Sequence, residues 1–281
     1  MDNTSYSSAG FRDRGIEEAL DGVAAAGFPQ VEVQGQSPHV AEPLTGQDLV
    51  AFRRRIEARG LRARSIHAPA GRAILGAPDE EWRKRNMELL GRYLQFASEL
   101  GATEMVVHPV PNPIFVDDDG PETPQKVRDA VPRSLDDLVP VAEAAGVRMT
   151  LENLPYHCAY PYLTMKELRP LVDDYPEGQV GLILDSGHVG LHAMDPAEEI
   201  RTAGSRLRGT HLHDVDYNVE DGDHRAPEHG GFDWGKIREA LIDIDYPGPW
   251  TFEVIVPNND ETPDELARIT RDFAVGWGIT G

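Results

Sequence analysis

The 281-residue chain contains one cysteine, four lysines and no long hydrophobic run. The single cysteine, Cys158, excludes an intrachain disulfide bond and fits a reducing compartment; beside only His157 as a basic neighbour, it is interpreted as a packing residue. Without a run of roughly 18 apolar residues, the sequence predicts no transmembrane helix. The first ten residues also lack the basic and apolar segments of a secretory signal. We therefore expect a cytoplasmic protein.

Basic residues are also scarce. The chain has 27 lysines and arginines against 48 aspartates and glutamates, a formal net charge of −21. Such a charge repels nucleic acids and anionic membrane surfaces, so neither is an expected partner. A surface dense in carboxylates and poor in lysine also suggests a halophilic protein, because a salt-rich cytoplasm would screen the self-repulsion.

The sequence does contain a regular alternation of short apolar strands and longer helical stretches. Strand candidates lie at 3–7, 30–34, 61–67, 104–108, 147–152, 179–185, 207–213 and 249–256. Helical patterns separate them, and several end at glycine. Eight such units predict an α/β fold, a single-domain (β/α)8 TIM barrel over residues 1–281. A doubly wound open sheet is less favoured, because no G-x-G-x-x-G follows the first strand.

Two long loops follow strands of the predicted barrel. Residues 109–122 and 214–232 are polar and rich in proline, glycine and aspartate. Loops of this length in a compact domain are usually functional or disordered, and a TIM barrel carries its active site on the loops that follow its strands. We expect both loops to form walls of an active site.

Most of the predicted strands end in an imidazole or a carboxylate, at the mouth of the barrel. The side chains at these ends are His67, His108, Glu152, Asp185, His211, His213 and Glu253. Four of them, Glu152, Asp185, His211 and Glu253, come from successive strands and should converge on one point. Three carboxylates brought together repel one another, whereas a divalent ion neutralises them. The sequence therefore predicts a site for one divalent metal ion, Mn, Mg, Co or Zn.

Dispersed ion pairs are the alternative interpretation of these strand ends. It is less favoured, because no arginine or lysine occupies a matching strand end.

The segments that carry these residues also resemble a known family. ENLP, LDSGH, HLHD and FEV occur in that order, with GGFDW and YPGPW before the last of them. They resemble the xylose isomerase-like barrels, which include sugar-phosphate isomerases and epimerases, ketose 3-epimerases, inosose dehydratases and the endonuclease IV class. The resemblance covers nearly the whole chain. Each motif alone is weak, but four in the right order with barrel spacing are specific.

The resemblance to ketose epimerases implies roles for the four converging residues. Glu152, Asp185, His211 and Glu253 would bind the metal, and Glu152 and Glu253 would also act as acid and base on opposite faces of the substrate. The metal would stabilise an enediolate formed beside the substrate carbonyl. His213 alternates with His211, so we expect the pleat to point it away and leave it to pack or hydrogen-bond nearby.

Further histidines are assigned to the substrate. His188 would hydrogen-bond a substrate oxygen, or else orient the metal carboxylates. His67, His108 and His224 would line the substrate pocket. In place of an arginine that ketose 3-epimerases carry six residues after the metal histidine, this chain has Tyr217.

The sequence leaves several functions open. The leading interpretation is an isomerase or epimerase of a small polyhydroxylated carbonyl compound, and an inosose-type dehydratase is the next. An endonuclease IV-like multi-metal phosphodiesterase is the third, although Gly222-Asp223-His224 displaces the acid of its Asp-x-His motif by one position. A non-catalytic sugar-binding barrel is the fourth. The resemblance is also compatible with a homo-oligomer.

Overall fold

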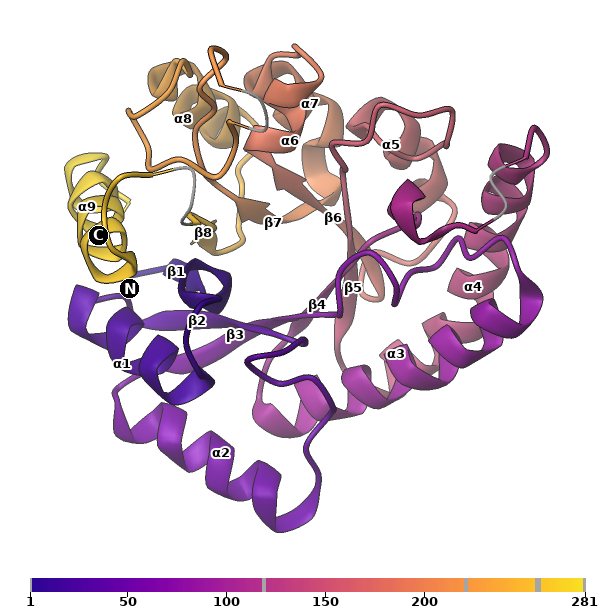
Figure 1. Cartoon of the computed structure of the whole chain (residues 1–281), viewed down its shortest axis with the longest axis horizontal. Helices are drawn as coiled ribbons and strands as arrows, with labels where there is room; N and C mark the ends of the chain where they lie inside the picture. Colours follow the sequence, from indigo (N-terminus) through magenta and orange to yellow (C-terminus); the bar gives the residue numbers. More distant parts are fainter. Residues whose placement is uncertain (1, 118–119, 220–221, 256–258, 280–281) are drawn as a thin grey trace.

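A closed ring of parallel strands forms the centre of the computed structural model, which describes residues 2–117, 120–219, 222–255 and 259–279 (Figure 1). The strands are β1 (Thr4–Ser7), β2 (Gln30–Gln34), β3 (Arg62–His67), β4 (Glu104–Val107), β5 (Arg148–Glu152), β6 (Val180–Asp185), β7 (Leu207–His211) and β8 (Trp250–Phe252). Neighbours in the sheet follow the chain order, and β1 pairs with β8. A parallel bridge between Leu212 and Phe252 joins β7 to β8. The predicted single-domain TIM barrel is confirmed.

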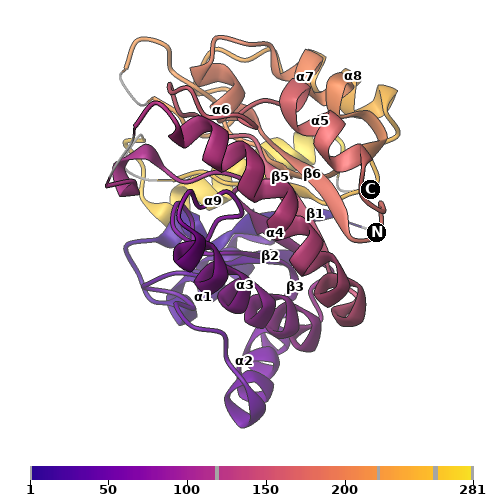
Figure 2. The same ribbon diagram turned by 90° about the vertical axis from the view of Figure 1, so that its right-hand side faces the viewer.

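Helices follow the strands and surround the barrel (Figure 2). The α-helices are α1 (Ile16–Ala26), α2 (Gly46–Ala58), α3 (Glu80–Leu100), α4 (Thr123–Ala145), α5 (Met165–Asp173), α6 (Ser186–Leu191), α7 (Pro196–Ala203), α8 (Trp234–Asp243) and α9 (Pro263–Gly276). Short 3-10 turns lie at Ser8–Phe11, Pro113–Phe115 and Gly204–Arg206. The predicted glycine stops are present after α1, α3 and α4, where Gly27, Gly101 and Gly146 adopt the left-handed conformation that favours glycine.

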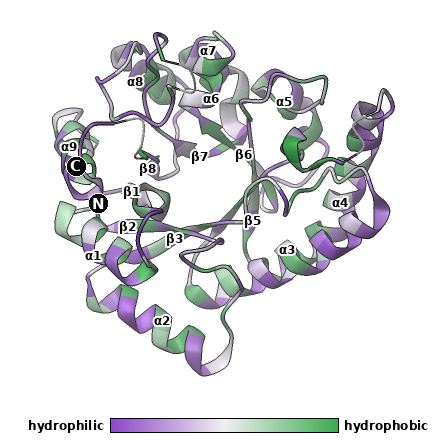
Figure 3. Cartoon of the chain, in the orientation of Figure 1, coloured by the Kyte–Doolittle hydropathy of each residue, from purple (hydrophilic) through white to green (hydrophobic). Residues whose placement is uncertain are grey.

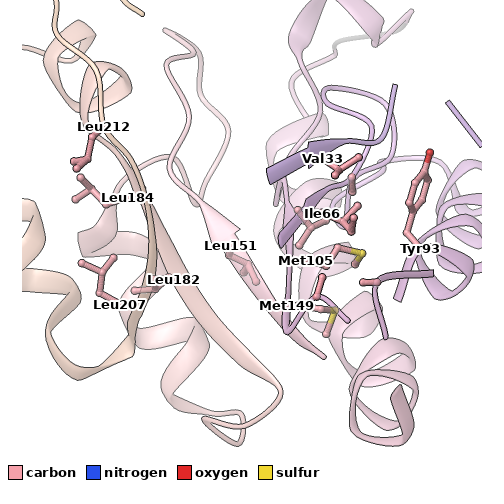
Figure 4. Packing of buried hydrophobic residues seen from close by; sticks show 14 of the residues in the cluster. Val33, Ile66, Tyr93, Met105, Met149, Leu151, Leu182, Leu184, Leu207 and Leu212 are labelled. Atoms are coloured by element: carbon pink, nitrogen blue, oxygen red, sulfur yellow. The ribbon is translucent and has the colours of Figure 1, made fainter. Parts of the chain in front are cut away.

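The hydrophobic core lies between the strands and the helices. Figure 4 shows such side chains, among them Leu151, Leu182 and Leu184. Along the helices, hydrophobic and hydrophilic stretches alternate (Figure 3), as expected for helices that cover a barrel. Cys158 is partly buried and packs against this core. Among the described residues, no helix combines the length and the apolar character that crossing a membrane requires.

Strand β2 shows how polar and apolar side chains are divided between the two faces of a strand. Val31 and Val33 belong to the hydrophobic core, whereas Glu32 and Gln34 on the other face reach polar partners from β7 and from the turn after β8. The barrel interior near its mouth is therefore polar, and the apolar side of each strand faces the helices. The loops after the strands lie at this mouth; residues 118–119, 220–221 and 256, which belong to the predicted loops and last strand, lie outside the described residues.

Candidate metal centre

The four predicted metal ligands come together at the mouth of the barrel. Each of Glu152, Asp185, His211 and Glu253 offers one ligand atom, and these atoms lie within 4.8 Å of one another. Glu152 is the last residue of β5, Asp185 of β6 and His211 of β7, while Glu253 follows β8 directly. Their exposed fractions are 6% or less. The closed ring of strands thus holds three carboxylates and an imidazole around one buried point.

The spacing of these atoms suits a shared cation. Nδ1 of His211 lies 3.1 Å from a Glu152 oxygen, 3.2 Å from a Glu253 oxygen and 3.8 Å from an Asp185 oxygen. Ligand atoms about 2.1 Å from a divalent ion lie about 3.0 Å apart along an octahedral edge and about 3.4 Å apart along a tetrahedral edge. The four donors fit a divalent ion with only small side-chain movements. An oxygen-rich set with one imidazole accepts Mn, Mg, Co or Zn.

Glu32 orients the His211 ring and was not predicted. Nε2 of His211 donates to a Glu32 oxygen at 2.8 Å, so that Nδ1 faces the other three ligands. The second oxygen of Glu32 accepts from Ser65 Oγ at 2.7 Å. A carboxylate behind a metal-binding histidine fixes its tautomer and makes it a stronger ligand. Glu32 lies in the middle of β2, where an alternating sequence normally places its polar face toward water.

Protons on imidazoles balance the buried carboxylates in this structure. Burial alone would raise the pKa of Glu152, but the positive charge of His211 and hydrogen bonds from neighbouring histidines hold that pKa well below its usual range. Burial alone would lower the pKa of His211, yet Glu253, Glu32 and Glu152 raise it well above the usual value. Within the described residues, no arginine or lysine forms an ion pair with these carboxylates. A divalent ion would take over the role of the protons.

The four histidines predicted to contact substrate line one cavity above the ligands. The cavity has a volume of about 180 Å³, and its walls include His67, His108, His188 and His224 together with Glu152 and Glu253. Nδ1 of His108 is buried without a hydrogen-bond partner among the described residues. Such a group usually meets a ligand or a water molecule. The structure therefore places these histidines where a bound molecule would touch them.

Side chains from the first two strands orient Glu253. Ser7 Oγ donates to Glu253 Oε1 at 3.1 Å, and Gln34 Nε2 donates to the same oxygen at 3.0 Å. The other oxygen, Oε2, lies 3.2 Å from His211 Nδ1 and 3.7 Å from His224 Nε2. Neither Ser7 nor Gln34 was predicted. They are the last residues of β1 and β2, but both are uncharged, and nothing else in the sequence distinguishes them from structural residues.

His213 hydrogen-bonds nearby, as expected, but the expectation that the strand pleat points it away from the centre is wrong. Its Nε2 lies 2.8 Å and 3.0 Å from the two oxygens of Asp185, and its ring stacks on His224 with ring centroids 4.1 Å apart. The strand ends at His211, so the pleat that would turn His213 outward no longer applies there. His213 thus holds both oxygens of Asp185.

Three more groups of described side chains have metal-ligand geometry. Two of them, the flanking groups, consist of His67, His108 and Glu152 and of His188, Asp223 and His224, and the third consists of Asp185, His213 and His224. The contact between Asp223 and His224 is 3.0 Å, which raises the pKa of His224 to about 10 against the effect of burial. The displaced acid of the Gly222-Asp223-His224 segment therefore still reaches the neighbouring histidine.

Among the described residues of the loop after β7, no arginine or lysine lines the cavity. Tyr217 is 57% exposed and packs edge-on against Phe232, and Arg225 lies 3.8 Å from Asp216. Neither residue lines the cavity, whereas Arg12, which follows the first 3-10 turn, does. The arginine position of the ketose 3-epimerases thus has no counterpart at residue 217.

Comparisons with known proteins agree with this architecture. The chain is 27% identical over 259 residues to D-psicose 3-epimerase from Enterocloster bolteae, covering 90% of this chain and 81% of that protein. It is 28% identical over 264 residues to the uncharacterized protein y4fM from Sinorhizobium fredii, covering 86% of this chain and 81% of that protein.

Solved structures show the same fold. A D-psicose 3-epimerase in the presence of D-fructose superimposes with a TM-score of 0.81 at 19% identity, covering 99% of this chain and 100% of the other. The IOLI protein with a binding zinc atom gives a TM-score of 0.80 at 18% identity, covering 98% and 97%. A model of the xylose isomerase-like TIM barrel family matches residues 20–273, and the chain belongs to this family.

Proposed function

We propose that the chain is a divalent-metal-dependent epimerase or isomerase of a small polyhydroxylated carbonyl compound. The observation that carries this proposal is the convergence of Glu152, Asp185, His211 and Glu253 to within 4.8 Å beneath a cavity lined by further histidines. Two of the four ligands are glutamates that also face the cavity. The D-psicose 3-epimerases among the relatives, whose names state activity on a ketose, support the same assignment.

In the proposed reaction, Glu152 and Glu253 handle the proton. A metal ion at the four ligands would polarise the substrate carbonyl and so acidify the adjacent C–H bond. One glutamate then removes that proton, and the other delivers a proton to the opposite face of the same carbon, which inverts its configuration. Delivery to the neighbouring carbon instead would isomerise the sugar.

The surroundings of the two glutamates prepare them for this role. Glu152 Oε2 lies 3.2 Å from Nε2 of His67 and 3.2 Å from Nε2 of His108, and Glu253 Oε1 is held by Ser7 and Gln34. Each carboxylate is therefore fixed at one oxygen while the other remains directed toward His211. This arrangement limits the movement needed during proton transfer.

Deuterium exchange tests the proposal. Metal-depleted protein is reloaded with Mn²⁺ and incubated in D2O with ketoses, inososes and sugar phosphates. We expect deuterium to enter a carbon beside the carbonyl, and Glu152→Gln and Glu253→Gln to reduce the rate about a thousandfold. The control Glu88→Gln alters an exposed glutamate of α3 and should leave the rate unchanged. Loss of water from the substrate would instead assign a dehydratase, and exchange in no compound would contradict both.

A second candidate function rests on the two flanking ligand groups. His67, His108 and Glu152, and His188, Asp223 and His224, are each placed to hold a further ion. A site with two or three ions suits hydrolysis of a phosphodiester, because the ions can activate water and stabilise the leaving oxygen. Metal analysis after purification in chelator-free buffer separates the candidates. One ion per chain supports the epimerase or isomerase, and two or three support the phosphodiesterase.

A further inference from the structure

A second hollow, the outer groove, lies beside the metal cavity. Its lining includes Arg72, Trp82, Arg85, Ile114, Phe115 and Lys126, and its volume of about 660 Å³ exceeds the 180 Å³ of the metal cavity. It is formed by the connections that follow β3 and β4 and by the first turns of α3 and α4. Because these connections leave the C-terminal ends of the strands, the groove opens on the same face as the metal cavity.

One thin stretch of backbone separates the two hollows. Ala70 lines the metal cavity and Arg72 lines the outer groove, so their Cα atoms are at most about 7 Å apart. Between them, Gly71 has a φ of +77°, and a Cβ there would lie 2.8 Å from the Phe115 ring. Phe115 therefore packs directly on the dividing backbone. The metal cavity and the outer groove therefore lie against neighbouring residues of one segment.

Arg72 is held in place at this dividing wall. Its carbonyl oxygen accepts from Trp82 Nε1 at 3.0 Å and from Asn86 Nδ2 at 3.0 Å. Its guanidinium lies over the Phe115 ring, 4.4 Å from the centroid. A guanidinium stacked on an aromatic ring keeps its N–H groups available for a planar anion.

The charges of the outer groove differ from those of the chain as a whole. The chain has a net charge of −21, yet Arg72 and Arg85 form no ion pair with any described residue. Lys126 adds a third positive charge, shared with Glu122 at 3.3 Å. Asp79 and Asp117 also line the groove, so its three cations exceed its two carboxylates by one. Ile114 at the groove is 77% exposed and offers apolar surface. The groove therefore suits an anionic group that is attached to a carbon framework.

The metal cavity has the opposite preference. Glu32, Glu152, Asp185 and Glu253 together carry four negative charges when ionised, a divalent ion balances half of them, and Arg12 of the lining offsets one more. An anionic group beside the ion would still lie close to these carboxylates, whereas one in the groove would meet arginines and be partly screened from them. The two hollows thus complement a molecule with a neutral reacting end and an anionic far end.

We propose that the outer groove binds an anionic group, a phosphate or a carboxylate, at the far end of a substrate whose carbonyl end occupies the metal cavity. This inference rests on the proposed function for the reacting end. Arg72 and Arg85 would contact the anion, and Trp82 and Phe115 would contact the connecting carbon atoms. They act on substrate affinity and take no part in proton transfer.

Matched ligand pairs test the groove independently of turnover. Calorimetry on the Mn²⁺-loaded protein compares D-fructose with D-fructose 6-phosphate, and D-glucose with D-glucuronate, so that each pair keeps its carbonyl and differs in an anionic group at the far carbon. We expect the anionic member of at least one pair to bind at least tenfold more tightly. The Arg72→Gln/Arg85→Gln double variant should remove that advantage and leave binding of the neutral member within twofold. The control Arg54→Gln, on the exposed side of α2, should change neither.

The outcomes separate this inference from the proposed function. An advantage of the anionic ligand that the double variant abolishes supports the groove, even if deuterium exchange is absent and the proposed reaction fails. Deuterium exchange without any advantage of an anionic ligand, or with an advantage that survives in the double variant, overturns the groove proposal. Where exchange occurs, the double variant should raise KM for the anionic substrate and leave kcat unchanged.

Discussion

Buried carboxylates at the two ends of the barrel have different charged partners. At the N-terminal end, Glu104 of β4 accepts from Arg64 and Arg148, each at 3.2 Å. At the C-terminal mouth, the only ion-pair partners of the carboxylates among the described residues are histidines. These carboxylates belong to Glu32, Glu152, Asp185 and Glu253. The chain itself supplies permanent cations at one end. At the other end it leaves room for protons or for an ion.

This difference assigns a stabilising role to the carboxylate at the N-terminal end of the barrel and a chemical role to those at the C-terminal mouth. An arginine cannot lose its charge, so Glu104 keeps two cations beside it at any ordinary pH, although burial raises the pKa of its carboxyl, and these contacts contribute only to the fold. A histidine can release its proton and then bind a metal, so the carboxylates at the mouth keep a site that an ion can enter. TIM barrels generally place stabilising residues at the N-terminal face and reactive residues at the C-terminal face. Variants at either end should therefore have opposite effects.

The largest effect is expected at the mouth. Asp185→Asn removes one of three ligand carboxylates and should lower activity about a thousandfold. The Tm of the metal-free protein should fall only slightly, because an asparagine keeps an oxygen that can accept from His213 and from the backbone N–H of His188. Steady-state rates with saturating Mn²⁺ and thermal unfolding in a chelator measure the two quantities. A large fall in the Tm of the metal-free protein, with activity retained, would reverse the assignment.

The opposite result is expected at the N-terminal end. Glu104→Gln leaves Arg64 and Arg148 without their shared carboxylate, and because those arginines are about one quarter exposed the free energy of unfolding should fall by about 2 kcal/mol. Activity per folded molecule should not change. Glu177→Gln is the matched control, since Glu177 contacts Arg208 at 3.4 Å but is 58% exposed. Urea denaturation should show less than about 0.5 kcal/mol for it.

A smaller effect is expected for the carboxylate behind His211. Glu32→Gln retains an oxygen for His211 Nε2 but removes the charge, and should weaken metal binding about 10- to 100-fold. Calorimetric titration of the metal-depleted protein with Mn²⁺ measures this affinity. Ser65→Ala, which removes the hydroxyl that donates to Glu32, should have the same direction and a lesser size. Unchanged affinity in Glu32→Gln would show that the ring is oriented by other contacts.

The smallest effect concerns a pair at the surface of α3. Hydrogen bonds from Arg83 and Arg133 lower the pKa of Glu80 to about 2. A carboxyl with a depressed pKa in the folded state stabilises the protein above its ordinary pKa of 4.5, and this contribution is lost as the pH falls toward 2. The Tm of Glu80→Gln should lie slightly below that of the native protein at pH 7, and this difference should shrink as the pH falls from 4.5 toward 2. A constant difference would exclude the ion pair as its cause.

The sequence predicted the site residues that come from β5 to β8 better than those that come from β2. Glu152, Asp185, His211 and Glu253 follow apolar runs at the ends of strands, so their position at the mouth is readable from the pattern. Glu32 and Gln34 lie inside an alternating strand, and alternation alone does not tell which face is turned inward. Only the closed ring brings them against residues more than 170 positions away, at His211 and Glu253.

The predicted direction of the His213 side chain is wrong for a related reason. Its assignment relied on the strand pleat continuing past His211, whereas β7 ends there and the chain turns His213 back onto Asp185. The outer groove was not predicted either, because Arg72, Arg85 and Phe115 belong to three separate segments and share no spacing. Contacts between loops depend on the lengths and turns of each connection, which sequence patterns do not fix.

Crystals of the metal-depleted protein soaked in Mn²⁺, with data collected at the manganese absorption edge, test the central claim most directly. We expect one strong anomalous peak bound by Glu152, Asp185, Glu253 and Nδ1 of His211, with Nε2 of His211 still donating to Glu32. A strongest peak at His188, Asp223 and His224, or no peak within reach of the four ligands, would contradict the account.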